Sequence, residues 1–249
     1  MESKDSLGDR MKGYEEEGNW IHSLDPSKPW IARLDGRSFS RFTKQLGLAK
    51  PFDVSFRLLM LSLAKSLKDE FNASFSYSQS DEITLIFPAI DYENGQQNVF
   101  GGKIQKLNSV MAGYASAKFV RLLDVFFPNA DKEKTPHFDC RIFNVPSETE
   151  ASNCLIWRVK DSYRNAVSMI GQANFSHKEL QGKKREDMIA MLSEKDIELT
   201  DFPEEYMYGF YLNKDGFQLI LSDFVELANR EDVIFRGESP IFRNNFLDK

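Results

Sequence analysis

Apolar residues in the first 146 positions alternate in some stretches and recur at helical spacing in others. The helical stretches are too rich in apolar residues to expose one side, so each is expected to pack on a sheet. A short polar helix at 38–44 follows the first strand, and Asp53 is a candidate N-cap of the next helix. The predicted elements are, in chain order, strand 30–35, helix 54–69, hairpin strands 71–77 and 83–87, helix 103–127 and strand 136–145.

This β-α-β-β-α-β order predicts an α+β fold of the ferredoxin-like βαββαβ type, with an antiparallel sheet and two helices on one face. In that topology, the end of the first strand and the tip of the hairpin can lie side by side. Asp35 ends the first strand and Asp81 occupies the hairpin tip. The topology therefore predicts that these two acids are neighbours.

The remainder of the chain is predicted to be rich in helix. Ser147 and Glu150 form a capping box before a helix that continues to about Gln172. Shorter helices follow, then a hairpin around 213–216 and an irregular tail near 239–242. We expect residues 1–146 to form a core and residues 147–249 an α-rich region packed on it, as one compact unit.

Composition limits the classes of function. The chain has 249 residues, a net charge of −6 and a pI near 5.3, which weighs against a general nucleic-acid coat. A local basic patch on an oligomer remains compatible with RNA binding, and magnesium could supply charge for a bound nucleotide. The two cysteines, the lack of an 18-residue apolar run and the polar N-terminus indicate a cytoplasmic protein without a membrane span.

The acidic residues at the strand ends are candidates for a metal site. Asp35 is followed at once by Gly36, and Asp81 is followed by Glu82. Each pair alone is also typical of a turn or a polar hairpin tip. Together in this topology they favour a site for two magnesium ions that catalyses phosphoryl transfer. Strand alternation predicts that Asp81, rather than Glu82, faces the metals.

Basic and amide side chains supply further candidates, each with an ordinary surface or ion-pair alternative. Lys103 and Lys106 share one face at the start of the long helix, where triphosphate oxygens could bind. Arg33 lies two residues before Asp35, on the same strand face. Arg158 and Asn165 share one helical face that could form an internal network or a ligand-facing groove, and Lys178 and Lys183 belong to a basic cluster that could contact an RNA backbone. These four residues are the candidate RNA contacts of the second half.

Several motifs in order resemble those of the tRNA-His guanylyltransferase family. The resemblance covers roughly 7–184 and includes five motifs in the family's order and spacing. The motifs are Arg33–Phe39, Lys50-Pro51, Ser78–Glu82, Phe138–Phe143 and Trp157–Asp161 with Arg164-Asn165.

The resemblance implies a polymerase-type palm that adds nucleotides in the 3′-to-5′ direction to the 5′ end of tRNA. ATP activates the 5′ monophosphate, and the 3′-hydroxyl of GTP or another NTP then attacks it. Homotetramers and two Mg²⁺ ions are implied as well. The implied metal ligands are Asp35, the Gly36 carbonyl and Asp81, with Glu82 as a further catalytic acid. The implied nucleotide contacts are Arg33, Gly36, Arg37, Ser38, Phe39, Lys50, Ser80, Asp81, Lys103 and Lys106.

Two departures from the family pattern indicate the substrate. The run His-Ile-Asn-Asn-Leu-Tyr-Asn of guanylyltransferases is replaced here by Tyr163–Met169, and a customary His is Ser40. This region is more similar to the guanylyltransferase-like branch, which repairs 5′-truncated tRNAs. Two alternatives stay open: a nucleotide cyclase or dinucleotide synthase on the same palm, and a non-catalytic tRNA-binding protein.

Overall fold

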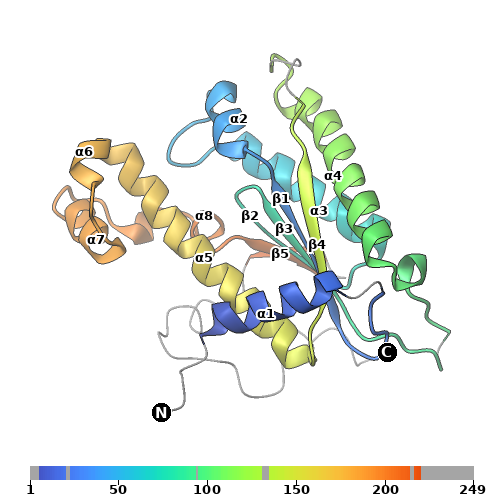
Figure 1. Ribbon diagram of the computed structural model, residues 1–249. Coiled ribbons are helices and arrows are strands. Elements are labelled where there is room, and N and C mark those ends of the chain that lie inside the picture. Colours follow the sequence, from blue (N-terminus) through green and yellow to red (C-terminus); the bar gives the residue numbers. More distant parts are fainter. Residues whose placement is uncertain (1–5, 21–22, 94, 131–134, 214–215, 220–249) are drawn as a thin grey trace, which may run out of the picture.

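The computed structural model describes residues 6–20, 23–93, 95–130, 135–213 and 216–219 (Figure 1). The irregular tail expected near 239–242 lies outside these residues. The strands are β1 (Trp30–Gly36), β2 (Phe75–Gln79), β3 (Glu82–Phe87), β4 (Phe138–Asn144), β5 (Phe210–Asn213) and β6 (Gly216–Leu219). They form one six-stranded antiparallel sheet in the order β4-β1-β3-β2-β5-β6.

The first four strands confirm the predicted ferredoxin-like arrangement, because β1 and β3 lie at the centre between β4 and β2. The expected hairpin near 213–216 is present as β5 and β6, and β5 pairs with β2. The region after residue 146 therefore contributes two strands to the same sheet.

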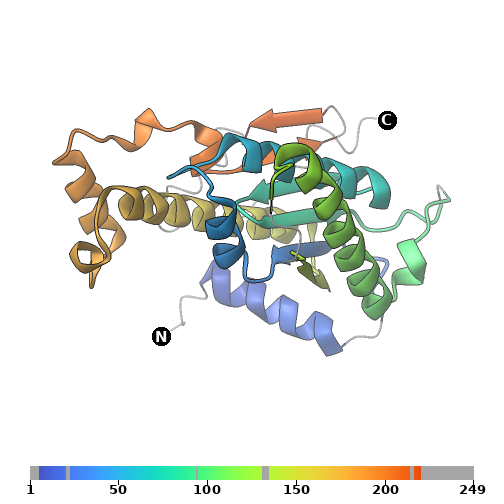
Figure 2. The same cartoon turned by 90° about the horizontal axis from the view of Figure 1, so that it is seen from above.

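Two layers of helices enclose the sheet (Figures 1 and 2). One face of β1 and β3 packs with α3 (Val54–Phe71) and α4 (Ile104–Phe126), through residues such as Leu34, Leu63 and Phe119. The other face packs with α1 (Leu7–Trp20) and α5 (Glu148–Asn174). The helices α2 (Phe39–Leu46), α6 (His177–Leu180), α7 (Arg185–Ser193) and α8 (Glu204–Met207) and the short 3₁₀ helices η1 (Val99–Gly102) and η2 (Leu199–Asp201) complete the set described.

Local signals explain the positions of several helix starts. Asp53 accepts a hydrogen bond from the Phe56 amide at 2.9 Å and caps α3, as predicted. Ser147 accepts one from the Glu150 amide at 3.3 Å and caps α5. No helix among the described residues is both long and apolar enough to cross a bilayer.

Helix α1 was not predicted from the sequence. It carries few apolar residues, and tertiary contacts rather than periodicity hold it in place: Met11 is fully buried against the sheet. Arg10 donates to Glu150 of α5 at 2.6 Å. Helix α1 packs against β4 and α5.

The end of β1 is shaped by a close contact between Gly36 and Phe39. A Cβ atom on Gly36 would lie 2.4 Å from the Phe39 ring, so only glycine fits there. Ser38 adopts a left-handed conformation (φ 59°) and turns the chain into α2. The Phe39 ring is 2% exposed and contacts Phe119 and Phe138, so it anchors this turn to the core.

We expect Gly36→Ala to lower the free energy of unfolding by about 1–3 kcal/mol, because the added methyl group must displace a buried ring. Thermal or denaturant unfolding monitored by circular dichroism measures this change. Gly113→Ala is the matched control, because Gly113 is an exposed position of α4 with no neighbour within 4 Å of a new Cβ. That control should be neutral or stabilise by up to about 1 kcal/mol. Equal stability of Gly36→Ala and wild type would contradict the packing argument.

Candidate functional site

Carboxylates gather where β1 ends. Asp35 lies opposite Glu82 on β3 and opposite Asp139 on β4. The Gly36 amide donates to the Asp81 carbonyl at 3.2 Å, which ties the end of β1 to the β2–β3 turn. The structure therefore brings Asp35 and Asp81 together, as the topology predicts.

Burial and neighbouring carboxylates make it harder for these two acids to ionise. Burial raises the pKa of Asp35, and the neighbouring Asp139 raises it further. Burial and the nearby Asp35 raise the pKa of Asp81 to about 6. Ser80, which has a left-handed φ of 48°, donates from its hydroxyl to the Asp81 carboxylate at 3.1 Å. Among the described residues, no hydrogen bond or ion pair engages the Asp35 carboxylate, so the pair offers free oxygen ligands to a cation.

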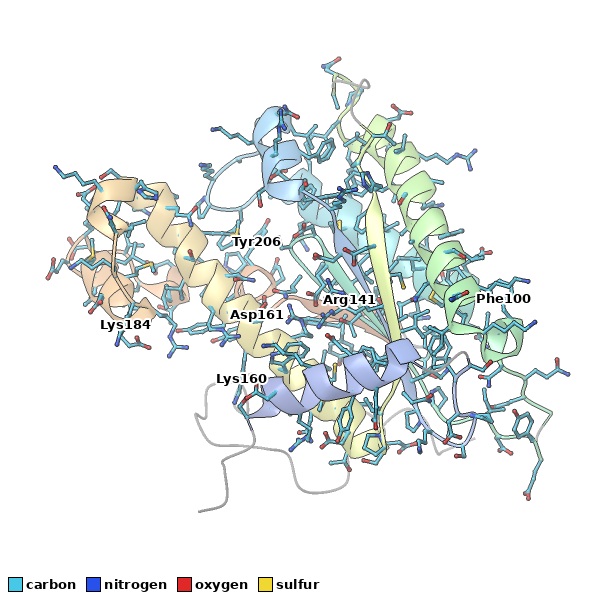
Figure 3. The ribbon with its side chains drawn as sticks, in the orientation of Figure 1. Phe100, Arg141, Lys160, Asp161, Lys184 and Tyr206 are labelled. Atoms are coloured by element: carbon cyan, nitrogen blue, oxygen red, sulfur yellow. The ribbon has the colours of Figure 1, made fainter. Side chains whose placement is uncertain are left out.

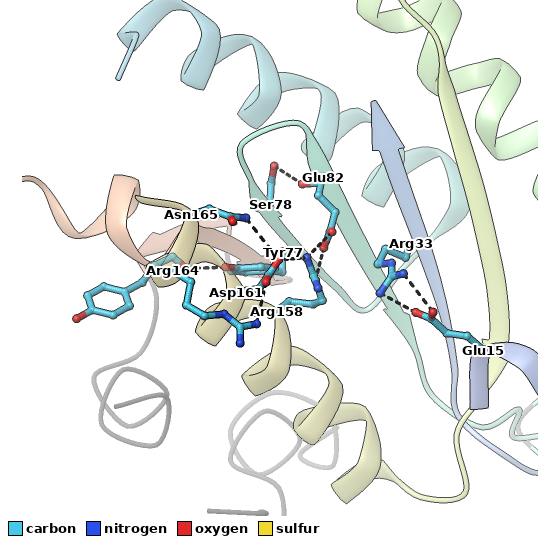
Figure 4. A network of polar contacts seen from close by, with 10 residues as sticks. Glu15, Arg33, Tyr77, Ser78, Glu82, Arg158, Asp161, Arg164 and Asn165 are labelled. Carbon is cyan, nitrogen blue, oxygen red and sulfur yellow. Dashed lines mark hydrogen bonds and ion pairs between the residues drawn. The ribbon is translucent and has the colours of Figure 1, made fainter. Parts of the chain in front are cut away.

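Glu82 is held by Arg158 of α5. The Arg158 guanidinium donates through Nε and Nη2 to the two Glu82 oxygens, both at 2.6 Å (Figure 4). Nη2 also donates to Asp161 at 2.8 Å, and Asp161 accepts from Arg164 at 2.8 Å. Burial raises the pKa of Glu82, and the Arg158 charge opposes that rise. The bidentate geometry fixes both the carboxylate and the distance between sheet and helix.

Strand alternation does not separate Asp81 from Glu82, contrary to the prediction. Asp81 lies in the turn, where strand alternation does not apply, and Glu82 shares the sheet face of Asp35 and Arg33. The two acids differ in whether they form an ion pair. Glu82 is paired with Arg158, whereas Asp81 accepts from the neutral Ser80 hydroxyl and has no ion-pair partner among the described residues.

Arg33 is paired with α1. Its Nη1 lies 2.6 Å from Glu15 Oε1, and its Nη2 donates to Glu15 Oε2 at 3.2 Å (Figure 4). The Trp157 ring lies next to both Arg33 and Arg158, whose guanidinium carbons are 5.1 Å and 4.7 Å from its centroid. The expected contact of Arg33 with a nucleotide would therefore compete with Glu15.

A cavity of about 640 Å³ opens beside these groups. Arg141 and Asp161 come from two different sides of it, β4 and α5 (Figure 3). Helix α1 contributes Lys12 and Glu15, which sequence reasoning missed because it did not find this helix. The full lining consists of Lys12, Glu15, Arg33, Asp35, Ser40, Gln79, Ser80, Asp81, Glu82, Arg141, Trp157, Arg158, Asp161, Asn165, Ser168, Met169 and Gln172.

The structure does not place all the expected nucleotide contacts at this cavity. The Phe39 ring is a core group, so a contact of this residue with a nucleotide would have to come from its backbone. Arg37 is exposed, with its Nη1 3.5 Å from His137 Nε2. Ser38 forms the turn into α2 without a side-chain cap bond. Lys50 is exposed in the loop before α3, outside the cavity lining.

Lys103 and Lys106 lie at the opposite end of the sheet from Asp35. They begin α4 next to Gly102, whose carbonyl accepts from the Leu24 amide at 2.8 Å near the start of β1. A seven-residue strand spans about 20 Å, so one chain does not bring these lysines to Asp35 and Asp81. The two lysines predict a basic helix start, but their spacing does not reveal the direction in which α4 runs along the sheet.

The candidate RNA contacts are divided between two places. Asn165 lines the cavity and donates weakly to Asp161 at 3.4 Å. Lys178 on α6 and Lys183 just after it are exposed beyond the end of α5 that is remote from β4. Arg158 is only 7% exposed, and its donors engage Glu82 and Asp161.

The donors at the strand ends suit a magnesium ion. The described residues contain no group of three or more His, Cys, Asp or Glu side chains that could hold a metal. Two carboxylates and a backbone carbonyl are nevertheless hard oxygen ligands, and substrate phosphates complete such sites in many phosphoryl-transfer enzymes. Burial and mutual repulsion raise the pKa values of Asp35 and Asp81, and a bound cation would oppose both effects.

Two curated relatives align with most of the chain. A mimivirus protein named uncharacterized protein R259 is 33% identical over 88% of this chain and 80% of its own length. The tRNA(His) guanylyltransferase of Kluyveromyces lactis is 25% identical over 86% of this chain and 93% of its own length.

Solved structures agree with the same relationship. A bacterial tRNA(His) guanylyltransferase (Thg1)-like protein in complex with ATP is 35% identical, with a TM-score of 0.72 over 86% of this chain and 91% of that one. A bacterial Thg1-like protein in complex with GTP is 32% identical, with a TM-score of 0.63 over 84% and 85%.

The family model described as Thg1, tRNAHis guanylyltransferase, matches residues 8–146, which is more than half of the chain. That segment contains β1, the β2–β3 turn and β4, so it includes both unpaired acids of the site. This chain belongs to the tRNA-His guanylyltransferase family, whose members are nucleotidyltransferases.

Proposed function

We propose that this protein is a magnesium-dependent nucleotidyltransferase that adds nucleotides in the 3′-to-5′ direction to the 5′ end of tRNA. The observation that carries the proposal is the pair of carboxylates Asp35 and Asp81 beside a polar cavity, for which the described residues supply no ion-pair partner. The ATP and GTP complexes of similar bacterial proteins support nucleoside triphosphates as substrates.

We assign a different function to each group of residues in the site. Asp35, Asp81 and the Gly36 carbonyl would hold two Mg²⁺ ions, which supply Lewis-acid chemistry for the attacking hydroxyl and the leaving phosphates. Ser80 orients the Asp81 carboxylate through its hydroxyl. Arg158 holds Glu82 in place at the cavity wall, and its charge opposes the rise in the pKa of that acid.

We propose repair of 5′-truncated tRNAs as the main substrate class. The altered stretch Tyr163–Met169 lies on α5, and its Ser168 and Met169 line the cavity. The 35% identity to a bacterial Thg1-like protein, against 25% to a tRNA(His) guanylyltransferase, supports the same assignment. Asn165, Lys178 and Lys183 are proposed tRNA contacts.

A homotetramer is proposed as the functional assembly, because one chain leaves Lys103 and Lys106 remote from its own acids. A neighbouring chain could bring them to its partner's site. The cytoplasm is the proposed compartment, and the free thiols Cys140 and Cys154 are in keeping with a reducing environment.

The direct test incubates the protein with 5′-truncated tRNA, ATP, NTPs and Mg²⁺, and follows 5′ extension on denaturing gels. Asp81→Asn should reduce the rate by at least about 100-fold, because several kcal/mol of transition-state stabilisation depend on the metal ligands. Glu70→Gln, which removes an exposed charge on α3, is the control and should retain activity. No extension on any tRNA, or full activity of Asp81→Asn, would contradict the proposal. A cyclic or dinucleotide product from NTP alone would favour the cyclase alternative.

A second prediction concerns stability and pH. The pKa of Asp81 is raised to about 6 in the folded protein, so its charge opposes folding above pH 6 and this cost disappears as the pH falls toward 4. Asp81→Asn carries no charge and should raise the melting temperature at pH 8 without divalent cations. The gain should shrink at pH 5.

Differential scanning fluorimetry measures both effects. Mg²⁺ should raise the melting temperature of wild type more than that of Asp81→Asn, because the metal relieves the same repulsion. Glu70→Gln should follow wild type in both buffers. A melting temperature of Asp81→Asn at or below that of wild type at pH 8 would refute the electrostatic account.

A third prediction concerns Arg158 as the residue that positions Glu82. Arg158→Lys keeps a positive charge but loses the two-pronged contact, so kcat should fall about 10-fold or more while the KM for tRNA changes little. Steady-state kinetics of 5′ extension measure kcat and the KM for tRNA separately. Arg164→Lys is the matched control, because Arg164 is about half exposed and contacts only Asp161 in this network. Equal kinetics of Arg158→Lys and wild type would exclude the positioning role.

A further inference from the structure

Four cationic side chains line the cavity, and two of them are already neutralised. Arg33 is paired with Glu15 at 2.6 Å and Arg158 with Glu82 at 2.6 Å. Lys12 has no ion-pair partner within the part of the chain that the structure describes. The fourth cation, Arg141 of β4, reaches Asp139 only at 3.9 Å.

The contact between Arg141 and Asp139 is weak, because both side chains are about half exposed, at 46% and 51%. Lys12 is exposed on α1, one turn before Glu15. These two cations are therefore the ones available to an anionic ligand in the described cavity.

Lys12 and Arg141 belong to the same wall. Arg141 lies opposite Arg33 in the β4–β1 register, two residues from Asp139, which lies opposite Asp35. Helix α1 packs along β4, so Lys12 faces the cavity from the helix that covers this strand (Figure 1). Both cations are thus on the α1–β4 side of the unpaired acids.

The α5 wall has a different chemistry. Beyond Asp161, its lining residues Asn165, Ser168, Met169 and Gln172 are uncharged. Amide, hydroxyl and thioether groups suit the base and ribose of a nucleotide, whereas they provide no charge for phosphates. Phosphate groups in this cavity therefore find their counter-charges on the α1–β4 wall.

We propose that Lys12 and Arg141 form a phosphate-binding subsite of the catalytic cavity, which takes the phosphate oxygens of a bound nucleotide or of the tRNA 5′ end. This inference rests on the proposed function. Arg141 can present two parallel N–H donors to a phosphate, and Lys12 adds a mobile point charge. Lys12 and Arg141 differ from Arg33 in this respect, because Arg33 is already paired with Glu15.

The subsite is tested first without catalysis, with inorganic tripolyphosphate as the probe in a buffer that contains Mg²⁺. Isothermal titration calorimetry of wild type is compared with Lys12→Gln, Arg141→Gln and the double variant. Each single change should weaken binding about 10-fold, and the double variant should abolish measurable binding. Lys12→Arg and Arg141→Lys keep the charge and should retain most of the tripolyphosphate binding. Arg121→Gln is the control, because Arg121 is an exposed cation of α4, on the other face of the sheet.

Two further measurements identify the source of the phosphates. Weaker binding of ATP or GTP with unchanged tRNA binding assigns the subsite to the nucleotide. Weaker tRNA binding, with a shallower dependence on salt, assigns it to the RNA 5′ end. Unchanged binding of tripolyphosphate, nucleotide and tRNA by the double variant overturns the inference.

The outcome is independent of whether tRNA extension itself is observed. If wild type extends no tRNA, the proposed function fails, while tripolyphosphate binding still decides whether the subsite exists. If wild type is active and the double variant has the KM values of wild type for ATP, GTP and tRNA, the proposed function stands and the subsite is refuted.

Discussion

The structure depends on one electrostatic constraint: several buried or half-buried acids must coexist where the central strand β1 ends. The antiparallel register sets Asp35 between Glu82 and Asp139, and the turn adds Asp81. Like charges at this separation raise one another's pKa values, so such a cluster needs cations to remain ionised. The helices around this cluster differ in which acids they provide with a cationic partner and which acids they leave without one.

Ion pairs connect the second helical layer to the sheet. Arg158 of α5 holds Glu82, and Glu15 of α1 holds Arg33. Such pairs are costly to bury unless their geometry is good, and the two-pronged Arg158 contact meets that condition. They also set the distance between each helix and the strand ends. The same two ion pairs therefore hold the charged side chains in place and determine the shape of the cavity.

The fold was largely predictable from the sequence, because each strand and long helix carries a local signal. Apolar density marked α3 and α4, and Asp53 and Ser147 marked two helix starts. Helix α1 gave no comparable signal, since Met11 and the Arg10–Glu150 pair act only in tertiary context. A helix held by contacts distant in sequence cannot be found from periodicity alone.

The site was predictable to the extent that topology determines it. The neighbourhood of Asp35 and Asp81 follows from the strand order. The partners of Arg33 and Glu82 do not, because ion pairs across layers depend on how α1 and α5 are rotated. The distance of Lys103 from Asp35 within one chain could not be predicted for a related reason. A charged pair at a helix start says nothing about which end of the sheet that start lies against.

The charge balance explains how an acidic protein can bind a polyanionic substrate. The chain carries a net charge of −6, and the cavity is lined by five acids and four cations. Once Glu15, Glu82 and Asp161 are paired with arginines, Asp35 and Asp81 remain against Lys12 and Arg141. This remainder is close to neutral, so it neither attracts nor repels phosphates strongly by itself. Two divalent cations on Asp35 and Asp81 would make the site positive, which couples substrate binding to metal binding. An acidic surface can then limit non-specific RNA binding while the site becomes receptive only when it is loaded with metal.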